Sequence, residues 1–99
     1  MAKKVVWTQT AIQDRVKIYQ YWANKNKSNL YSEKLERLFG EGAKLLSEFP
    51  EIGTQTDFQN IRVKVIRTYK LFYLNQPDSI QILRVWHTGQ DPDKLEVEQ

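Results

Sequence analysis

The chain has 99 residues, of which 40% are hydrophobic and 27% charged, and it contains no cysteine. This length suits one domain with a single core, which we expect to fold without disulfides or a structural metal. The absence of cysteine also excludes thiol nucleophiles, thiolate zinc sites and iron–sulfur clusters.

The net charge of +3 is unevenly distributed along the chain. Residues 88–99 contain four acids and one lysine, so this segment contributes −3 and residues 1–87 contribute +6. We therefore predict one domain over residues 1–90 and a polar, acidic C-terminal tail over 91–99. A basic domain favours an acidic partner over a membrane, and the absence of a signal-type segment at the N-terminus indicates a cytoplasmic protein.

Two helices are predicted in the first half, after a short β-type run over Lys4–Trp7. Thr8 or Thr10 can cap the first helix, with Gln13 completing a capping box from Thr10. The apolar stripe that we expect to enter the core consists of Ile12, Val16, Tyr19 and Trp22. The second helix begins at Ser28 or Asn29 and ends at Pro50. Its predicted apolar face consists of Tyr31, Leu35, Leu38, Gly42, Leu45 and Phe49.

The hydrophobic period changes to two after a predicted loop over Glu51–Gln59. Alternating residues predict three strands, joined by short turns at Arg67–Thr68 and Asn75–Ser79. The predicted order is β-α-α-β-β-β. This describes an α+β fold, with two N-terminal helices packed on one face of a small antiparallel sheet.

Cationic residues in the predicted strands indicate a basic surface on the sheet. Arg62 and Lys64 are two residues apart and therefore share one face of their strand, where they can neutralise phosphates together. Arg67, Lys70 and Arg84 can add further donors, and arginine is suited to bidentate phosphate contacts. The alternative for Arg62 and Lys64 is a solvated outer face of the sheet. For Arg84, a charge within the apolar run from Ile82 to Trp86, the alternative is a pairing with an acidic residue.

Aromatic residues of the last two strands permit two interpretations. Trp86 and Tyr69 can stack on nucleobases, or they can serve as packing in a small core. Trp7, Trp22 and Tyr19 are assigned to the core.

His87 is the only histidine of the chain and follows the last predicted strand run. Its ordinary pKa of about 6.5 suits proton transfer near neutral pH, which makes it the candidate general acid. Glu51 or Asp57 is the candidate base. A strand-end histidine with a purely structural role is the alternative.

Several short strings follow one another in a shared order and spacing. They are Val6-Trp7-Thr8 with Ala11 and Asp14, then Phe49-Pro50-Glu51-Ile52-Gly53, Asn60-Ile61-Arg62, Tyr69-Lys70-Leu71-Phe72-Tyr73 and Ile80-Gln81-Ile82-Leu83-Arg84-Val85-Trp86-His87. In this arrangement, from residue 5 to about residue 92, the chain resembles the RelE/ParE superfamily of bacterial toxins.

The resemblance implies the toxin of a type II toxin–antitoxin pair, held inactive by an acidic and partly disordered antitoxin segment. RelE-like members cut messenger RNA in the ribosome without a metal or cofactor, and ParE-like members poison DNA gyrase. A histidine at the position of His87 acts as general acid in some RelE-like ribonucleases. Those enzymes often have a tyrosine where this chain has Thr88, and many ParE-like members have a basic residue where it has Gln90.

Three functions follow for testing. The first is a metal-free, ribosome-dependent endoribonuclease that inhibits translation, with His87, Arg84 and Arg62 as catalytic residues. In that reading Lys64, Arg67, Lys70 and Trp86 bind the RNA. The second is a gyrase poison, and the third is a non-toxic binding module.

Overall fold

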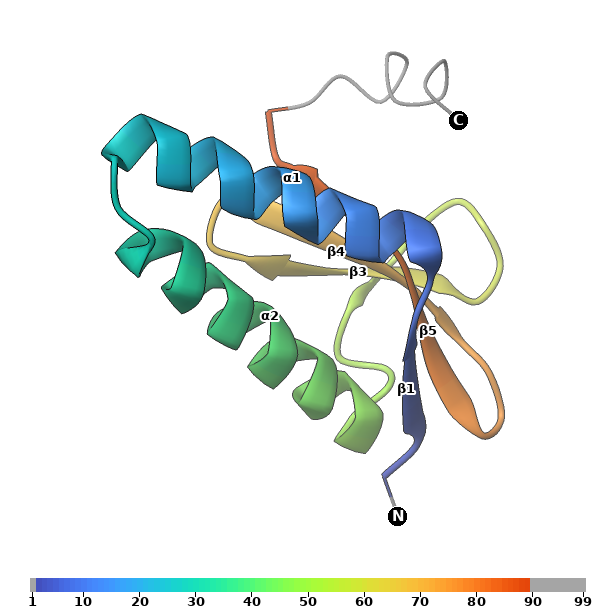
Figure 1. Cartoon of the computed structure of the whole chain (residues 1–99). Helices are drawn as coiled ribbons and strands as arrows, with labels where there is room; N and C mark the ends of the chain where they lie inside the picture. Colours follow the sequence, from blue (N-terminus) through green and yellow to red (C-terminus); the bar gives the residue numbers. More distant parts are fainter. Residues whose placement is uncertain (1, 90–99) are drawn as a thin grey trace.

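The computed structural model describes residues 2–89, in which two helices form a layer over a sheet (Figure 1). The elements in chain order are β1 (Lys4–Trp7), α1 (Gln9–Asn26), α2 (Leu30–Glu48), β2 (Thr54–Gln55), β3 (Ile61–Ile66), β4 (Tyr69–Asn75) and β5 (Ser79–His87). The predicted β-α-α-β-β-β order is confirmed, with the two-residue strand β2 added inside the predicted loop. The predicted tail over 91–99 lies outside the described residues.

The strands form one sheet in the order β1-β5-β4-β3-β2. β1 pairs with β5 in parallel and the other neighbours are antiparallel, so the sheet is mixed and not wholly antiparallel as predicted. The two helices lie between β1 and the rest of the sheet in sequence, and they return the chain so that the first and last strands become neighbours. Residues 67 and 68 form the turn between β3 and β4 as predicted, and Arg67 adopts a left-handed φ of 58° there.

The core lies between α2 and one face of the sheet. From the sheet it takes side chains of two central strands: the alternating Tyr69, Leu71 and Tyr73 of β4, and Ile80, Ile82 and Val85 of β5, where a register shift separates Ile82 from Val85 by three positions. From α2 it takes Leu35, Phe39, Ala43 and Leu46. The ring of Phe39 meets Tyr69 edge-on, with centroids 5.6 Å apart, so aromatic packing fixes α2 against the centre of the sheet.

α1 begins at Thr8, whose hydroxyl accepts a hydrogen bond from the Ala11 amide at 3.1 Å and donates one to the Leu83 carbonyl at 3.1 Å. Thr8 is therefore the N-cap, and the capping box expected from Thr10 is not used. The predicted apolar stripe is wrong in part, because Ile12 and Val16 are 47% and 49% exposed. The inward side of the helix carries Trp22, as predicted, together with Ala11 and Ile18.

The buried face of α2 overlaps only in part with the predicted one. Leu35 is buried as expected, but Phe39 and Leu46 are buried as well, whereas Leu45 and Phe49 are 39% and 55% exposed. Asn29 occupies the N-cap position without a side-chain hydrogen bond there. The helix packs closely against β3 at Gly42, where an added Cβ atom would meet the Ile66 side chain.

The loop after α2 is held to the sheet by Tyr73 and Arg62. The Tyr73 hydroxyl donates to the Pro50 carbonyl at 2.7 Å and accepts from the Gly53 amide at 3.0 Å. A Cβ atom at Gly53 would lie 2.5 Å from the same hydroxyl oxygen, so this approach requires glycine. Burial raises the pKa of the Tyr73 hydroxyl above its ordinary value, and the hydrogen bond from Gly53 opposes that rise.

Candidate target-binding site

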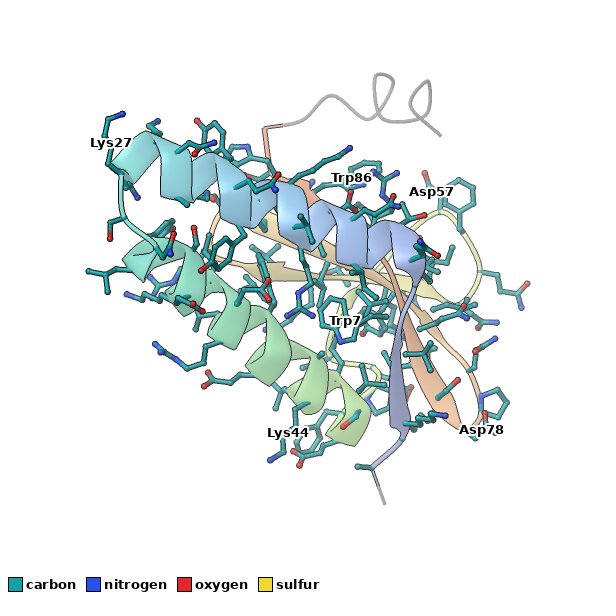
Figure 2. All side chains as sticks on the ribbon, viewed as in Figure 1. Trp7, Lys27, Lys44, Asp57, Asp78 and Trp86 are labelled. Carbon is teal, nitrogen blue, oxygen red and sulfur yellow. The ribbon has the colours of Figure 1, made fainter. Side chains whose placement is uncertain are left out.

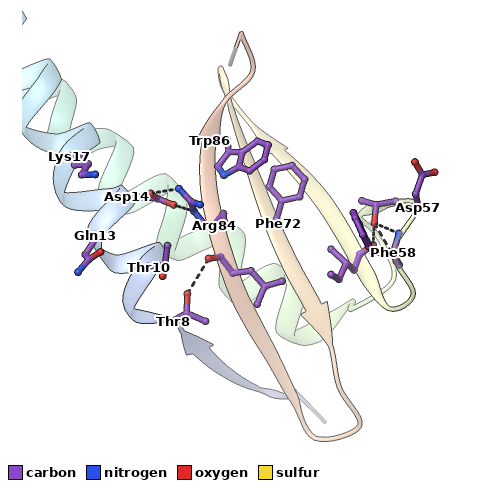
Figure 3. Close-up of a pocket in the computed structure, with 13 residues that line it drawn as sticks. Thr8, Thr10, Gln13, Asp14, Lys17, Asp57, Phe58, Phe72, Arg84 and Trp86 are labelled. Carbon is purple, nitrogen blue, oxygen red and sulfur yellow. Dashed lines mark hydrogen bonds and ion pairs between the residues drawn. The ribbon is translucent and has the colours of Figure 1, made fainter. Parts of the chain in front are cut away.

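A groove of about 810 Å³ runs between the first half of α1 and the face of the sheet that points away from α2 (Figure 3). We call it the outer groove. Its α1 wall includes Gln13, Asp14 and Lys17, and its opposite wall is the loop at residues 56–58. Its sheet residues include Phe72, Leu83, Arg84 and Trp86. Phe72, Arg84 and Trp86 belong to this outer face because strand side chains alternate and their neighbours Leu71, Tyr73 and Val85 enter the core.

Arg84 is held in the outer groove by Asp14. Its Nε and Nη2 atoms donate to the two Asp14 carboxylate oxygens at 2.9 and 3.2 Å. Asp14 Oδ2 also accepts from the Val85 amide at 3.0 Å. The two side chains are only 17% and 12% exposed, so the ion pair is shielded from water and the guanidinium charge is already balanced.

Two aromatic rings form the outer face next to this pair. The Phe72 and Trp86 centroids are 4.6 Å apart at an interplanar angle of 56°, and the Arg84 guanidinium carbon lies 5.8 Å from the Trp86 ring. Within residues 2–89, the Trp86 Nε1 atom is buried without a hydrogen-bond partner. Lys70 is the cross-strand neighbour of Trp86 and therefore belongs to the same face of the sheet. The surface is thus aromatic and amphipathic.

A second hollow, of about 650 Å³, lies between the last half of α1 and the end of β5. We call it the His87 hollow, and Tyr21, Trp22, Tyr69 and Lys25 also line it. The His87 ring meets Tyr69 edge-on with centroids 5.5 Å apart, and His87 Nδ1 accepts from the Gly89 amide at 3.0 Å. A neutral imidazole in this arrangement carries its proton on Nε2.

Tyr69 lies at the base of the same hollow. Its hydroxyl accepts a hydrogen bond of 2.7 Å from the Trp22 indole, which ties α1 to β4. Burial raises the pKa of the Tyr69 hydroxyl, and the Trp22 hydrogen bond opposes the rise. Tyr69 is therefore a neutral packing residue at physiological pH.

A family model matches residues 5–92, nearly the whole chain, and describes the ParE toxin of the type II toxin–antitoxin system parDE. The chain belongs to the ParE toxin family. The RelE/ParE resemblance seen in the sequence is confirmed by this match. No match was found among curated protein sequences.

Solved structures of toxin–antitoxin systems share the fold of this ParE-family chain. A chromosomal ParDE system from P. aeruginosa aligns with a TM-score of 0.75 at 19% identity, covering 87% of this chain and 96% of that one. A chain of the toxin–antitoxin complex RelBE2 from Mycobacterium tuberculosis aligns with a TM-score of 0.60 at 24% identity, covering 88% of this chain and 99% of that one. A chain of the toxin–antitoxin complex DinJ-YafQ from E. coli aligns with a TM-score of 0.51 at 17% identity, covering 88% of this chain and 93% of that one.

The ParE-family fold separates the cations that the sequence suggested would form one surface. Arg62 and Lys64 share a face, as expected, but in the β3–β4 register they stand opposite Tyr73 and Leu71, on the helix side. Lys70, Arg84 and Trp86 point to the outer face.

Arg62 also has a structural contact. Its Nη1 atom donates to the Glu51 and Gly53 carbonyls at 3.0 and 2.8 Å, which holds the loop after α2. Arg67 is exposed in the β3–β4 turn.

The candidate acid and bases occupy different places. His87 lines the His87 hollow, whereas Asp57 lines the outer groove. Glu51 is exposed on the loop that Arg62 holds. Among residues 2–89, no three histidine, aspartate or glutamate side chains are grouped as metal ligands. In the same span, neither helix is long and apolar enough to cross a bilayer.

Three contributors to these surfaces were missed in the sequence. Asp14 lies three residues after the buried Ala11 and is therefore on nearly the same side of α1. An acid on the inward side of a helix could have indicated a cationic partner such as Arg84. Lys17 lines both hollows, because it lies at the middle of α1 between them. Phe58 is 67% exposed in the outer groove, and nothing in its polar loop sequence indicated this exposure.

Proposed function

We propose that this ParE-family chain is the toxin of a type II pair and that it acts by binding a host protein, DNA gyrase, rather than by cutting RNA. The observation that carries the proposal is the separation of the catalytic candidates. Metal-free RNA cleavage needs a proton donor and cations around the same phosphate. Here Arg84 is bound by Asp14, Arg62 is bound by loop carbonyls, and His87 lines a different hollow from Arg84.

The composition of the outer groove supports a protein target. Exposed aromatic residues at the centre of a patch with a polar rim are typical of protein interfaces, where a few aromatic anchors supply most of the affinity. The exposed Phe58 and the half-buried Phe72 and Trp86 provide such anchors. The lining cations Lys17 and Arg84 are matched by Asp14 and Asp57, so the groove lacks the excess positive charge that a phosphate backbone requires.

The ribonuclease remains the second candidate. His87 shares its hollow with two lysines, Lys17 and Lys25, which could stabilise a phosphorane while the imidazole donates a proton. The substrate would be messenger RNA on the ribosome, and the outcome would be inhibition of translation.

An antitoxin is proposed as the physiological partner. The structural neighbours from M. tuberculosis and E. coli are parts of toxin–antitoxin complexes, and residues 1–87 of this chain carry a net charge of +6. We expect the adjacent reading frame to encode a small acidic protein with a DNA-binding half, whose other half orders on the toxin.

Induction of the chain in a bacterium tests the proposal. Incorporation of labelled thymidine should fall before incorporation of labelled amino acid, and the cells should form filaments. An early loss of translation would indicate the ribonuclease instead, and normal growth would indicate the non-toxic module.

A further inference from the structure

Phe58 is the most exposed of the aromatic side chains that line the outer groove. It lies on the loop between β2 and β3, across the groove from α1 (Figure 3), and it is 67% exposed. Phe72 and Trp86 are half-buried and pack against each other on the sheet. Burial of a phenyl ring normally stabilises a fold, and this ring gives up most of that gain. Packing of the core therefore does not explain where the Phe58 ring is held.

Thr56 fixes the backbone of the loop at Phe58. Its Oγ1 atom accepts a hydrogen bond from the Phe58 amide at 3.1 Å. The same oxygen lies 2.8 Å from the Ile61 carbonyl and 3.3 Å from the Phe58 carbonyl, so its single proton is donated to the nearer Ile61 carbonyl. The Ile61 amide in turn donates to the Phe58 carbonyl at 3.2 Å. Both polar backbone groups of Phe58 thus have partners within the loop, and the partner of its amide is the Thr56 hydroxyl.

The loop is also closed at its base. The Thr56 amide donates to the Ile61 carbonyl at 3.2 Å, and the Asn75 amide of β4 donates to the Asn60 carbonyl at 2.9 Å. Asn60 has a left-handed φ of 66°, a conformation that asparagine adopts more readily than most residues. Thr56 is half-buried, whereas residues 57–60 are exposed. The loop is therefore an ordered support that carries an exposed ring.

An exposed ring on an ordered loop has the properties of a binding anchor. A side chain that is held in its bound position before contact loses less conformational entropy on association. Because the ring projects from the rim of the groove, a partner can bury it only by surrounding it. The partner surface that fits is an apolar recess that admits a phenyl ring, beside a projecting apolar side chain that contacts Phe72 and Trp86.

We propose that Thr56 is a positioning residue, whose hydroxyl holds the Phe58 ring ready to insert into an apolar recess of the target protein. The inference rests on the proposed binding of gyrase through the outer groove. It identifies the side chain that preorganises one anchor of that interface, and it specifies the chemistry that the target presents to the anchor.

Variants of Thr56 separate its hydroxyl from its methyl group. Thr56→Ala removes both groups, and Thr56→Ser removes only the methyl group. Thr56→Ala should raise the concentration of chain that half-inhibits gyrase supercoiling about fivefold, because the loop must then be ordered on binding. Thr56→Ser should stay within about twofold of the unmodified chain. Thr54→Ala is the matched control, at an exposed threonine of β2 outside the groove lining, and it should also stay within about twofold. Equal losses in Thr56→Ala and Thr56→Ser would overturn the role of the hydroxyl.

A double-mutant cycle shows whether Thr56 acts through Phe58. In the Phe58→Ala background, Thr56→Ala should change the half-inhibiting concentration by less than about twofold, because no ring is left to position. If Thr56→Ala costs the same factor in both backgrounds, Thr56 does not act through the ring and the proposal fails. Urea denaturation of each variant gives the folded fraction, for which the concentrations are corrected.

Proteolysis measures the order of the loop without gyrase. Chymotrypsin cleaves after phenylalanine, and cleavage in the loop requires local opening of its hydrogen bonds. Cleavage after Phe58, followed by mass spectrometry, should be at least about fivefold faster in Thr56→Ala than in the unmodified chain or in Thr56→Ser. Equal rates in all three chains would refute the positioning role of Thr56. Failure of the unmodified chain to inhibit gyrase would refute the proposed function instead, whatever the rates of cleavage.

Discussion

Asp14 uses both carboxylate oxygens to join the first helix to the last strand, with bonds to the Arg84 guanidinium and the Val85 amide. These groups are largely buried, so removal of either charge leaves the other without compensation in a poorly solvated place. Arg84 is thereby explained as a charge within an apolar strand that pairs with an acid, which is the alternative that the sequence left open.

Asp14→Asn should lower the free energy of unfolding by about 2–4 kcal/mol, because it leaves the Arg84 charge unbalanced. Urea denaturation measures this change. Arg37→Ala is the matched control, because Arg37 and Glu41 are 64% and 66% exposed at 4.0 Å and their pair should contribute about 0–0.5 kcal/mol. Equal effects of the two variants would show that the Asp14–Arg84 pair does not stabilise the fold.

Tyr73→Phe should lower the free energy of unfolding by about 1–3 kcal/mol at neutral pH, since it leaves the Gly53 amide and the Pro50 carbonyl without their partner. The raised pKa of Tyr73 means that the folded chain keeps this proton at a pH where the unfolded chain has lost it. Its contribution to stability is therefore complete below about pH 10 and declines as pH rises from there through the folded pKa.

Thermal denaturation between pH 8 and 11 checks this effect. The unmodified chain should lose stability above about pH 10, and Tyr73→Phe should lose less of its remaining stability over that range. If stability fell with pH in parallel for Tyr73→Phe and the unmodified chain, ionisation of Tyr73 would not be the cause of the loss.

At the scale of elements, the two glycines of α2 differ in what surrounds them. A Cβ atom at Gly40 would meet nothing within 4 Å, whereas one at Gly42 would meet the Ile66 side chain of β3. Gly40→Ala should raise the free energy of unfolding by about 0.5–1 kcal/mol, because alanine favours the helix. Gly42→Ala should be less favourable than Gly40→Ala by about 1 kcal/mol, because Ile66 must shift. Urea denaturation of both variants measures the two changes in the free energy of unfolding. Equal increases would mean that α2 and β3 are not in close contact.

The sequence predicted the order of the elements but not which helix faces are buried. α1 carries apolar residues on two sides, and the spacing of Ile12 and Val16 is as regular as that of Ala11, Ile18 and Trp22. Which side turns inward depends on how α1 packs on α2 and β5, and helical periodicity alone does not contain that information. The strand β2 was missed because two residues give no detectable period.

The faces of the hairpin could have been derived from the sequence. The two-residue turn at 67–68 sets Ile66 opposite Tyr69, and counting from there sets Lys64 opposite Leu71. Lys70 therefore had to point to the face opposite to Lys64. The position of Arg84 could not be derived in this way, because the register shifts between Phe72 and Tyr73.

At the scale of the whole molecule, the sheet presents two surfaces with different chemistry. The outer groove has aromatic anchors and balanced charges (Figure 2 labels Trp86 and Asp57 there), whereas among residues 2–89 the His87 hollow is lined by lysines and by no acid. The sequence predicted His87 and Trp86 as functional candidates, but their separation into two surfaces required the fold.

We propose that the outer groove binds gyrase and that His87 performs no catalysis. The most direct measurement is DNA supercoiling by purified gyrase in the presence of the purified chain. We expect the chain and its His87→Ala variant to inhibit supercoiling alike. Phe58→Ala should weaken inhibition about tenfold or more without loss of stability, whereas Leu30→Ala, at a side chain 82% exposed outside the groove, should not. Gyrase that is unaffected, together with cleavage of ribosome-bound messenger RNA that His87→Ala abolishes, would contradict the claim.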